Sequence, residues 1–260
     1  MFPKNAGMED GWTYNPNKQG LDYAVVDNEQ YEGSNSLRIS ASKNSAQSLF
    51  RVQDGPNYSG KTYRLEAMVK AEEGQTAHFS MGACFTCSAK SGWAYGWARS
   101  EVVEVSDEWT LVTMTFCYDF DALEGTLSVS SNGNEPAVTN DIVSVAAYDF
   151  VLSLANENEV AYVDDLAMYE VYDAKVTVTK SDGSIAKDAT FVITDPRGNE
   201  RVANVAYNEE QGCYLFEGLY GVQSLVATAG GETFDAVKVT KVTAANGINI
   251  ERSYTITLTI

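Results

Sequence analysis

An aromatic stretch near the middle of the chain carries the residue types best suited to binding a ligand. Residues 91–99 read Ser-Gly-Trp-Ala-Tyr-Gly-Trp-Ala-Arg, so that Trp93, Tyr95 and Trp97 are separated by single small residues. In an extended strand, side chains two residues apart share a face and lie roughly 7 Å from one another. Three rings on one face either pack into a sandwich core or form a surface on which a ligand stacks. We favour the ligand surface, because the residues between the rings are small rather than polar.

Residues that could perform catalysis or bind zinc are sparse. The chain has one histidine, His78, and no Ser-His constellation, G-x-S-x-G motif or P-loop is evident. Asp164 and Asp165 are neighbours, which face opposite sides of a strand and so cannot flank one glycosidic bond. Cys84-Phe-Thr-Cys87 lacks the second pair that a closed zinc site needs. We expect no catalytic residue and no zinc, and buried free thiols, with a local Cys84–Cys87 bridge left open.

The composition narrows the class of partner. The 260 residues include 18 Lys or Arg and 36 Asp or Glu, which gives a net charge of −18. Such a field repels nucleic acid and anionic membranes and favours neutral or cationic ligands. No signal-peptide pattern and no membrane-spanning run is evident, so we expect no membrane insertion. We interpret the sequence as a part of a larger secreted or cell-surface protein rather than as a cytoplasmic one.

The chain reads as all-β. Strand patterns recur about every ten residues and are separated by Gly, Asn, Asp and Ser turns, whereas helical periodicity is almost absent. The expected strands include 36–40, 62–70, 109–118, 159–169, 175–180 and 253–260. A domain boundary is expected near residues 171–174, because all four Trp precede it and residues 172–260 carry only 8 basic and 11 acidic residues.

The first part of the chain resembles a known family in the order of its motifs. Residues 3–170 are similar to the carbohydrate-binding modules of the family 4, 9 and 22 superfamily. The matching motifs are Asn5-Ala-Gly-Met-Glu9 with Trp12, Gly33-Ser-Asn-Ser36-Leu37, Gly60-Lys-Thr-Tyr63-Arg-Leu65, Trp109-Thr110 and Ala161-Tyr162-Val-Asp164-Asp165. Each motif is weak alone, but the ordered set is fairly specific. The resemblance implies a jelly-roll β-sandwich over residues 1–171, with a ligand cleft on its concave sheet.

The resemblance also implies a structural calcium ion near the two ends of this module. Calcium prefers oxygen ligands, which carboxylates and backbone carbonyls supply. By motif, Glu9 and Asp165 would provide side-chain oxygens, with Gly33 and Ser36 near a backbone ligand. The alternative is that Glu9 is a turn residue and Asp165 an exposed strand carboxylate.

The family's cleft strand lies just before the Trp-Thr strand, which is where the aromatic stretch falls. Pyranose rings stack on aromatic planes while their hydroxyls bond to polar groups at the rim. The expected ligand residues are Trp93, Tyr95, Trp97 and Arg99, with Tyr118, Phe120 and Gln53 as further candidates. The family places Trp109 in the core, and Trp12 is expected to be structural; Tyr162 is left between packing and binding. The chain departs from the family at residues 82–91, where a Cys-containing segment replaces the usual short turn.

Residues 172–260 resemble an immunoglobulin-like module of the Cna-B or carboxypeptidase-regulatory type. Lys175-Val-Thr-Val-Thr-Lys180 resembles its opening, and residues 212–225 resemble its glycine-punctuated central motif. Some Cna-B modules form an isopeptide bond assisted by a glutamate, but the matching position here is Ala227. The resemblance therefore implies an Ig-like β-sandwich without an isopeptide bond. This module would serve as a spacer or support.

Together these features predict non-catalytic binding of a neutral polysaccharide or oligosaccharide of β-glucan or xylan type. The module would target tethered catalytic or scaffold modules of a bacterial glycan-degrading protein to their substrate. The alternative is a surface adhesin or structural sandwich that binds host glycan or protein. A lone enzyme ranks last, because no catalytic constellation is evident.

Overall fold

The computed structural model describes residues 17–52, 61–89, 92–118, 142–180, 182–230, 232–233, 237–245 and 248–254. These residues are strands, turns and bends, so the described chain is all-β. It divides into two compact units, Met1–Ser59 with Tyr63–Met168 and Gly60–Thr62 with Tyr169–Ile260. No helix long and apolar enough to cross a membrane occurs among the described residues.

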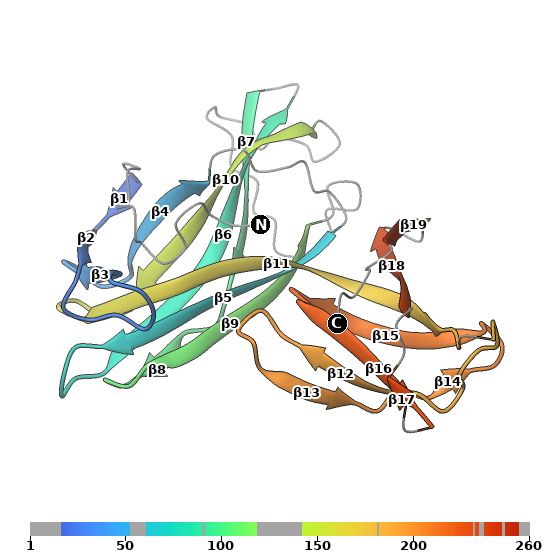
Figure 1. The fold of residues 1–260 in the computed structure, drawn as a ribbon. Coiled ribbons are helices and arrows are strands. Elements are labelled where there is room, and N and C mark those ends of the chain that lie inside the picture. Colours follow the sequence, from blue (N-terminus) through green and yellow to red (C-terminus); the bar gives the residue numbers. More distant parts are fainter. Residues whose placement is uncertain are drawn as a thin grey trace. The chain divides into compact units, whose positions relative to one another are not determined.

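The first unit is a jelly-roll-like sandwich of two sheets (Figure 1). One is a six-stranded sheet in the order β1-β4-β10-β6-β7, with β8 also paired to β6. Every strand pair of this sheet whose register is described is antiparallel. Its strands are β1 Asn17–Gln19, β4 Ala46–Val52, β6 Ala77–Ala89, β7 Gly92–Arg99, β8 Val103–Val105 and β10 Ile142–Leu154.

The facing sheet of the first unit has the order β2-β3-β11-β5-β9. Its strands are β2 Leu21–Val26, β3 Ser36–Ala41, β5 Lys61–Ala71, β9 Thr110–Tyr118 and β11 Val160–Val178, of which the first part belongs to this unit. Alternation along each strand builds the core between the sheets. On β5, for example, Leu65 and Ala67 are fully buried in the core cluster, and Phe79 and Met81 of β6 belong to the same cluster.

Strand β11 is longer than the sequence predicts. Its residues 160–163 pair with β3, and its residues 171–178 pair with β15 or β18 of the second unit. The two strands expected at residues 159–169 and 175–180 are therefore one strand, and the domain boundary expected near residues 171–174 stays a prediction. Residues 160–178 contain neither glycine nor proline, so no backbone signal ends the strand there.

The second unit is also a two-sheet sandwich. One sheet has the order β14-β15-β11-β18-β19 and the other β13-β12-β16-β17. Phe191, Tyr214 and Phe216 form edge-to-face ring pairs in its core, and Ala227 is fully buried there. The Ig-like arrangement and the lack of an isopeptide bond stay predictions. The remaining strands are β12 Thr190–Thr194, β13 Glu200–Ala203, β14 Tyr207–Asn208, β15 Cys213–Tyr220, β16 Ser224–Ala229, β17 Glu232–Thr233, β18 Val237–Ala245 and β19 Ile248–Tyr254.

The segment in which the chain departs from the family pattern is strand, not a turn. Strand β6 continues to Ala89, and it pairs with β7 in unbroken register from Gly82↔Arg99 to Ala89↔Gly92. Cys84 and Cys87 are three residues apart on this strand, so their Cα atoms are about 10 Å apart. A disulfide spans less than about 7 Å between Cα atoms, so this backbone disfavours a local bridge.

Candidate functional site

The outer face of the six-stranded sheet is identified by the residues that alternate with its core. Phe79 and Met81 of β6 belong to the core cluster, so that His78, Ser80 and Gly82 lie on the opposite face. The last two residues of β7 alternate in the same manner: Ala98 is buried in the core cluster and Arg99 is exposed. Arg99 therefore lies on the outer face, where the sequence predicts a ligand.

The aromatic stretch forms most of β7, as the sequence predicts (Figure 1). The backbone of Trp93 pairs with Ser88, that of Tyr95 with Thr86 and that of Trp97 with Cys84. The side chains of the three aromatic residues lie outside the described part of the structure. Their role as ligand residues stays a prediction.

A row of polar side chains crosses the outer face from β7 to β1. Arg99 donates a hydrogen bond of 2.7 Å from Nη2 to Oε1 of Gln47 on β4. Gln47 in turn donates from Nε2 to Oε1 of Gln19 on β1, also at 2.7 Å. Strands β10 and β6 lie between β4 and β7 in the sheet, so the Arg99 and Gln47 side chains meet above them. The sequence analysis missed Gln19 and Gln47, because their contact depends on pairing between distant strands.

Small residues lie beneath this polar row. Gly82 is paired with Arg99 on one side and with Val151 of β10 on the other. A Cβ atom at Gly82 would lie 2.3 Å from the backbone oxygen of Ala98, so a larger residue cannot fit without moving β7. Val151 alternates with the core residues of β10 and is nevertheless only 1% exposed.

The other candidate ligand residues are distributed differently. Gln53 and Phe120 lie outside the described residues. Tyr118 is the last residue of β9, a strand of the facing sheet. The side chain of Tyr118 lies outside the described part of the structure. Tyr162, left open between packing and binding, is 5% exposed and also lies on the facing sheet, in β11.

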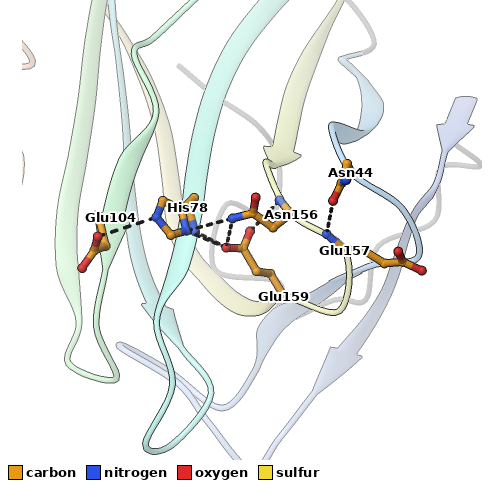
Figure 2. Close-up of polar contacts among 6 residues, drawn as sticks. All are labelled: Asn44, His78, Glu104, Asn156, Glu157 and Glu159. Atoms are coloured by element: carbon orange, nitrogen blue, oxygen red, sulfur yellow. Dashed lines mark hydrogen bonds and ion pairs between the residues drawn. The ribbon is translucent and has the colours of Figure 1, made fainter.

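A polar cluster around the single histidine lies at one end of β6 (Figure 2). His78 Nδ1 lies 2.6 Å from Oε1 of Glu159, which also accepts hydrogen bonds from the Asn156 side chain at 2.8 Å and from the His78 backbone N–H at 3.1 Å. Nε2 of His78 lies 3.6 Å from Oε2 of Glu104 on β8. An ionised Glu159 can only accept, so its 2.6 Å contact with Nδ1 of His78 requires the proton to lie on Nδ1. The cluster ties β6, β8 and the β10–β11 turn together.

Glu159 gives this cluster a defined response to acid. Burial raises the pKa of its carboxyl, but hydrogen bonds from Asn156 and His78 outweigh burial and lower the pKa below the usual value of 4.5. An acid with a lowered pKa in the folded state adds stability above its unfolded pKa and loses it as the pH falls through the folded one. We therefore expect Glu159→Gln to lower the free energy of unfolding at pH 7 by about 1–2 kcal/mol. Urea unfolding between pH 3 and pH 7 measures the effect.

Glu157 provides the matched control for this prediction. It lies two residues away, and Figure 2 shows its carboxylate directed away from the cluster, while its backbone N–H donates to Asn44 at 2.9 Å. Glu157→Gln should leave the free energy of unfolding within about 0.5 kcal/mol of the unmodified chain. Equal effects of the two substitutions, or a Glu159→Gln variant with an unchanged acid response, would contradict the role of Glu159.

The predicted calcium residues meet in part at one end of the β3–β11 pair. Leu37 pairs with Val163, so the next residues, Ser36 and Asp164, lie beside each other. Both are fully buried, and the hydroxyl of Ser36 has no hydrogen-bond partner among the described residues. Asp165 adopts φ +44°, which is uncommon for any residue but glycine. Glu9, the other predicted carboxylate ligand, lies outside the described residues.

Asp164 has a structural role that the sequence analysis did not assign. Its Oδ2 accepts hydrogen bonds from the backbone N–H of Tyr31 at 2.9 Å and of Glu32 at 3.2 Å, and its Oδ1 accepts from Asp165 at 2.7 Å. Burial raises the pKa of this carboxyl, although these three donors act in the opposite direction. Asp164 thus fastens the loop before β3 to β11. Within the described residues, no group of three or more His, Cys, Asp or Glu side chains could hold a metal ion by itself.

Trp109 is not a core residue, contrary to the expectation from the family. It is half-buried and lies outside the core cluster of the first unit. Its ring contacts that of Tyr31 edge-to-face, with centroids 6.0 Å apart, and Lys70 Nζ lies 5.9 Å from the Trp109 centroid. Trp109 immediately precedes β9, whose core residues begin at Val112, so alternation places it on the outer face of the second sheet.

Comparison with known proteins gives one family match. The model of the family described as "Carbohydrate binding domain", CBM_4_9, matches residues 4–137. No curated protein matches the chain.

Several solved structures share low sequence identity with the chain. The CBM22-1 xylan-binding domain from Paenibacillus barcinonensis Xyn10C is 12% identical, over 63% of this chain and 90% of that one, with a TM-score of 0.45. The CBM22-1–CBM22-2 tandem domain of the same protein is 10% identical, over 94% of this chain and 83% of that one, with a TM-score of 0.43. A family 11 carbohydrate-binding module from Clostridium thermocellum was solved in complex with a β-1,3-1,4-mixed-linked tetrasaccharide. It is 10% identical, over 58% of this chain and 82% of that one, with a TM-score of 0.36.

Proposed function

The chain belongs to the carbohydrate-binding domain family, whose model matches residues 4–137, and we propose that it binds a neutral polysaccharide without catalysis. The ligand is a β-glucan or xylan type of chain, and it binds on the outer face of the six-stranded sheet. The observation that carries this proposal is that the aromatic stretch forms β7, which ends at Arg99, and that Arg99 is exposed on that face.

The alternation of β7 supports a ring surface there. Arg99 is exposed and Ala98 is buried, and β7 pairs with β6 without a bulge over its whole length. The proposal places Trp97, Tyr95 and Trp93 on the face of Arg99, because they precede it at the strand period of two. Sugar rings would stack on this row through their apolar C–H faces.

The polar row supplies the hydroxyl-binding groups that such a surface needs. Arg99 offers donors, and the amides of Gln47 and Gln19 offer both donors and acceptors. The three side chains already bond to one another in a line across the sheet, so part of their rotamer entropy is lost before a ligand binds. Removal of a partner from this row should weaken binding by altering the orientation of its neighbour.

The test of the proposed function is native affinity electrophoresis of the chain in gels that contain soluble xylan, mixed-linkage β-glucan or hydroxyethylcellulose. We expect retardation in at least one of these neutral polysaccharides and none in polygalacturonate, because the net charge of −18 repels an anionic chain. Equal mobility in all neutral gels and in a gel without polysaccharide would contradict the proposal. Release of reducing sugar during incubation would contradict its non-catalytic part.

A structural calcium ion fits the residues at the end of the β3–β11 pair. The partnerless hydroxyl of buried Ser36, the left-handed backbone at Gly33 and Asp165, and the Asp165 carboxylate are compatible with an oxygen-rich site. Glu9 and backbone carbonyls would complete the set. Bound there, calcium would fasten the loop before β3 to β11 and so add to the stability of the first unit.

Removal of calcium is expected to destabilise the first unit. An ion that binds only the folded state, at one hundred times its dissociation constant, adds about 2.7 kcal/mol. For a unit of this size we expect the Tm in EGTA to be about 5 °C or more below the Tm in calcium chloride. Differential scanning calorimetry measures the shift, and Asp165→Asn should reduce it. The same Tm in both buffers would contradict the calcium proposal and leave the sugar surface unaffected.

The net charge and the module type support a role in an exported glycan-degrading protein. Tethering to a catalytic or scaffold module would raise the local concentration of that module at the polysaccharide surface. The second unit would then act as a spacer or support between such modules.

A further inference from the structure

A second set of aromatic side chains lies on the outer face of the other sheet in the first unit. Tyr31 is 39% exposed, and its ring meets the half-buried Trp109 edge-to-face at 6.0 Å between centroids. Lys70 Nζ lies 5.9 Å from the Trp109 centroid and 5.9 Å from the Tyr162 centroid. We call these four residues the second aromatic surface. The sequence leaves Tyr162 open between packing and binding and assigns none of the other three to ligand binding.

Independent contacts hold this surface in place. Asp164 fixes the backbone of Tyr31 and Glu32 through two hydrogen bonds, which sets the position of the Tyr31 ring. Glu29, on the same loop, forms an ion pair of 2.7 Å with Lys70, whose side chain is only 12% exposed. Lys70 is therefore held between a carboxylate and two rings. A preorganised aromatic site loses less conformational entropy on binding than a mobile one.

The surface combines the two kinds of group that a sugar requires. Tyr31 and Trp109 leave ring area open to solvent, on which a pyranose ring can stack. Lys70 and Glu29 supply a donor and an acceptor at its edge, and Glu29 is 33% exposed. A second ion pair, Arg38–Glu72 at 3.6 Å, adds further polar groups on the same face, since Arg38 pairs with Tyr162 in the sheet.

Charge selects the class of ligand. Glu32 and Glu108 are exposed and adjoin Tyr31 and Trp109 in sequence, and Glu29 and Glu72 contribute two more carboxylates. The cations Lys70 and Arg38 are already paired with carboxylates. An anionic ligand would therefore meet uncompensated negative charge, whereas an uncharged one would not.

We propose that the second aromatic surface is a separate site for an uncharged carbohydrate. This proposal rests on the proposed function for the class of ligand, but it names a different sheet and different residues. Two sites on opposite outer faces would let one molecule contact two polysaccharide chains at once, with a gain in avidity.

The test follows the four indole N–H signals of the 15N-labelled full chain during titration with xylohexaose and with cellohexaose. Trp109→Phe identifies the Trp109 signal. We expect the Trp109 signal to shift with either hexasaccharide both in the unmodified chain and in the Trp97→Ala variant, which weakens the β7 face. Tyr31→Ala should raise the dissociation constant reported by Trp109 by about three- to tenfold, and leave that reported by Trp93 and Trp97 unchanged.

Val202→Ala provides the control, because Val202 is 66% exposed and lies in the second unit. It should change neither dissociation constant. A Trp109 signal that does not move at saturating hexasaccharide overturns the second site, whatever the other signals do. Movement of the Trp93 and Trp97 signals in the same titration shows that the proposed function survives, whereas their immobility counts against that function as well. A dissociation constant at Trp109 that is unchanged by Tyr31→Ala also overturns the site.

Discussion

Trp97→Ala is expected to weaken retention of the chain on a binding polysaccharide by about ten- to thirtyfold, with little change in stability. A stacked ring at the centre of a binding surface contributes about 1.4–2 kcal/mol, which corresponds to this range. Trp97 precedes the exposed Arg99 by two residues on β7, and the proposal places its ring on the binding face, so its removal should leave the core intact. Affinity electrophoresis at several polysaccharide concentrations gives the dissociation constant, and urea unfolding gives the stability.

Trp97→Phe and Val202→Ala are the matched controls. Phenylalanine keeps a ring at the position and should recover part of the affinity. Val202 is exposed in the second unit, so its truncation should alter neither property. If Trp97→Ala instead lowers the free energy of unfolding by about 3 kcal/mol or more, as truncation of a core aromatic does, the ring belongs to the core and the binding face is wrong.

Asp164→Ala should produce the largest loss of stability of any substitution considered for this chain. The carboxylate is fully buried and accepts three backbone hydrogen bonds, from Tyr31, Glu32 and Asp165. Its removal leaves these donors without an acceptor, and we expect the free energy of unfolding to fall by about 3 kcal/mol or more. Asp164→Asn should cost less, because an amide oxygen can still accept from the Tyr31 loop.

The control for Asp164 is Glu32→Gln, an exposed neighbour of the same loop. Urea unfolding at pH 7 should give a lower free energy of unfolding for Asp164→Ala than for Asp164→Asn. The value for Glu32→Gln should lie within about 0.5 kcal/mol of that of the unmodified chain. A loss below about 1 kcal/mol for Asp164→Ala would mean that water replaces the carboxylate, and that the loop does not depend on it.

The sequence predicts the fold class and most strands because alternation is a local property. The expected strands at 36–40, 62–70 and 109–118 correspond to β3, β5 and β9, and the ordered motifs identify the family that the match over residues 4–137 confirms. The two strands expected at 159–169 and 175–180 are a single strand, β11, whereas the domain boundary expected near residues 171–174 stays a prediction. The Ig-like assignment of residues 172–260 stays a prediction.

The site is less predictable, because it depends on which strands become neighbours. Gln19 and Gln47 are 28 residues apart, and Arg99 is 52 residues from Gln47, so no local pattern joins them. Trp109 looks like a core residue by family position, yet it is only half-buried and its ring contacts that of Tyr31, which is 78 residues away. Asp164 is neither a catalytic group nor a metal ligand predicted from the sequence, and its role depends on a loop more than 130 residues away.

The proposed function requires that the aromatic residues of β7 lie open on the outer face of the six-stranded sheet and stack against a neutral sugar chain. A crystal structure of the chain with xylohexaose or cellohexaose tests it most directly. We predict sugar rings over Trp93, Tyr95 and Trp97, with hydroxyls bonded to Arg99 and Gln47. Rings of β7 enclosed between the two sheets, or a hexasaccharide bound only elsewhere on the molecule, would contradict the account.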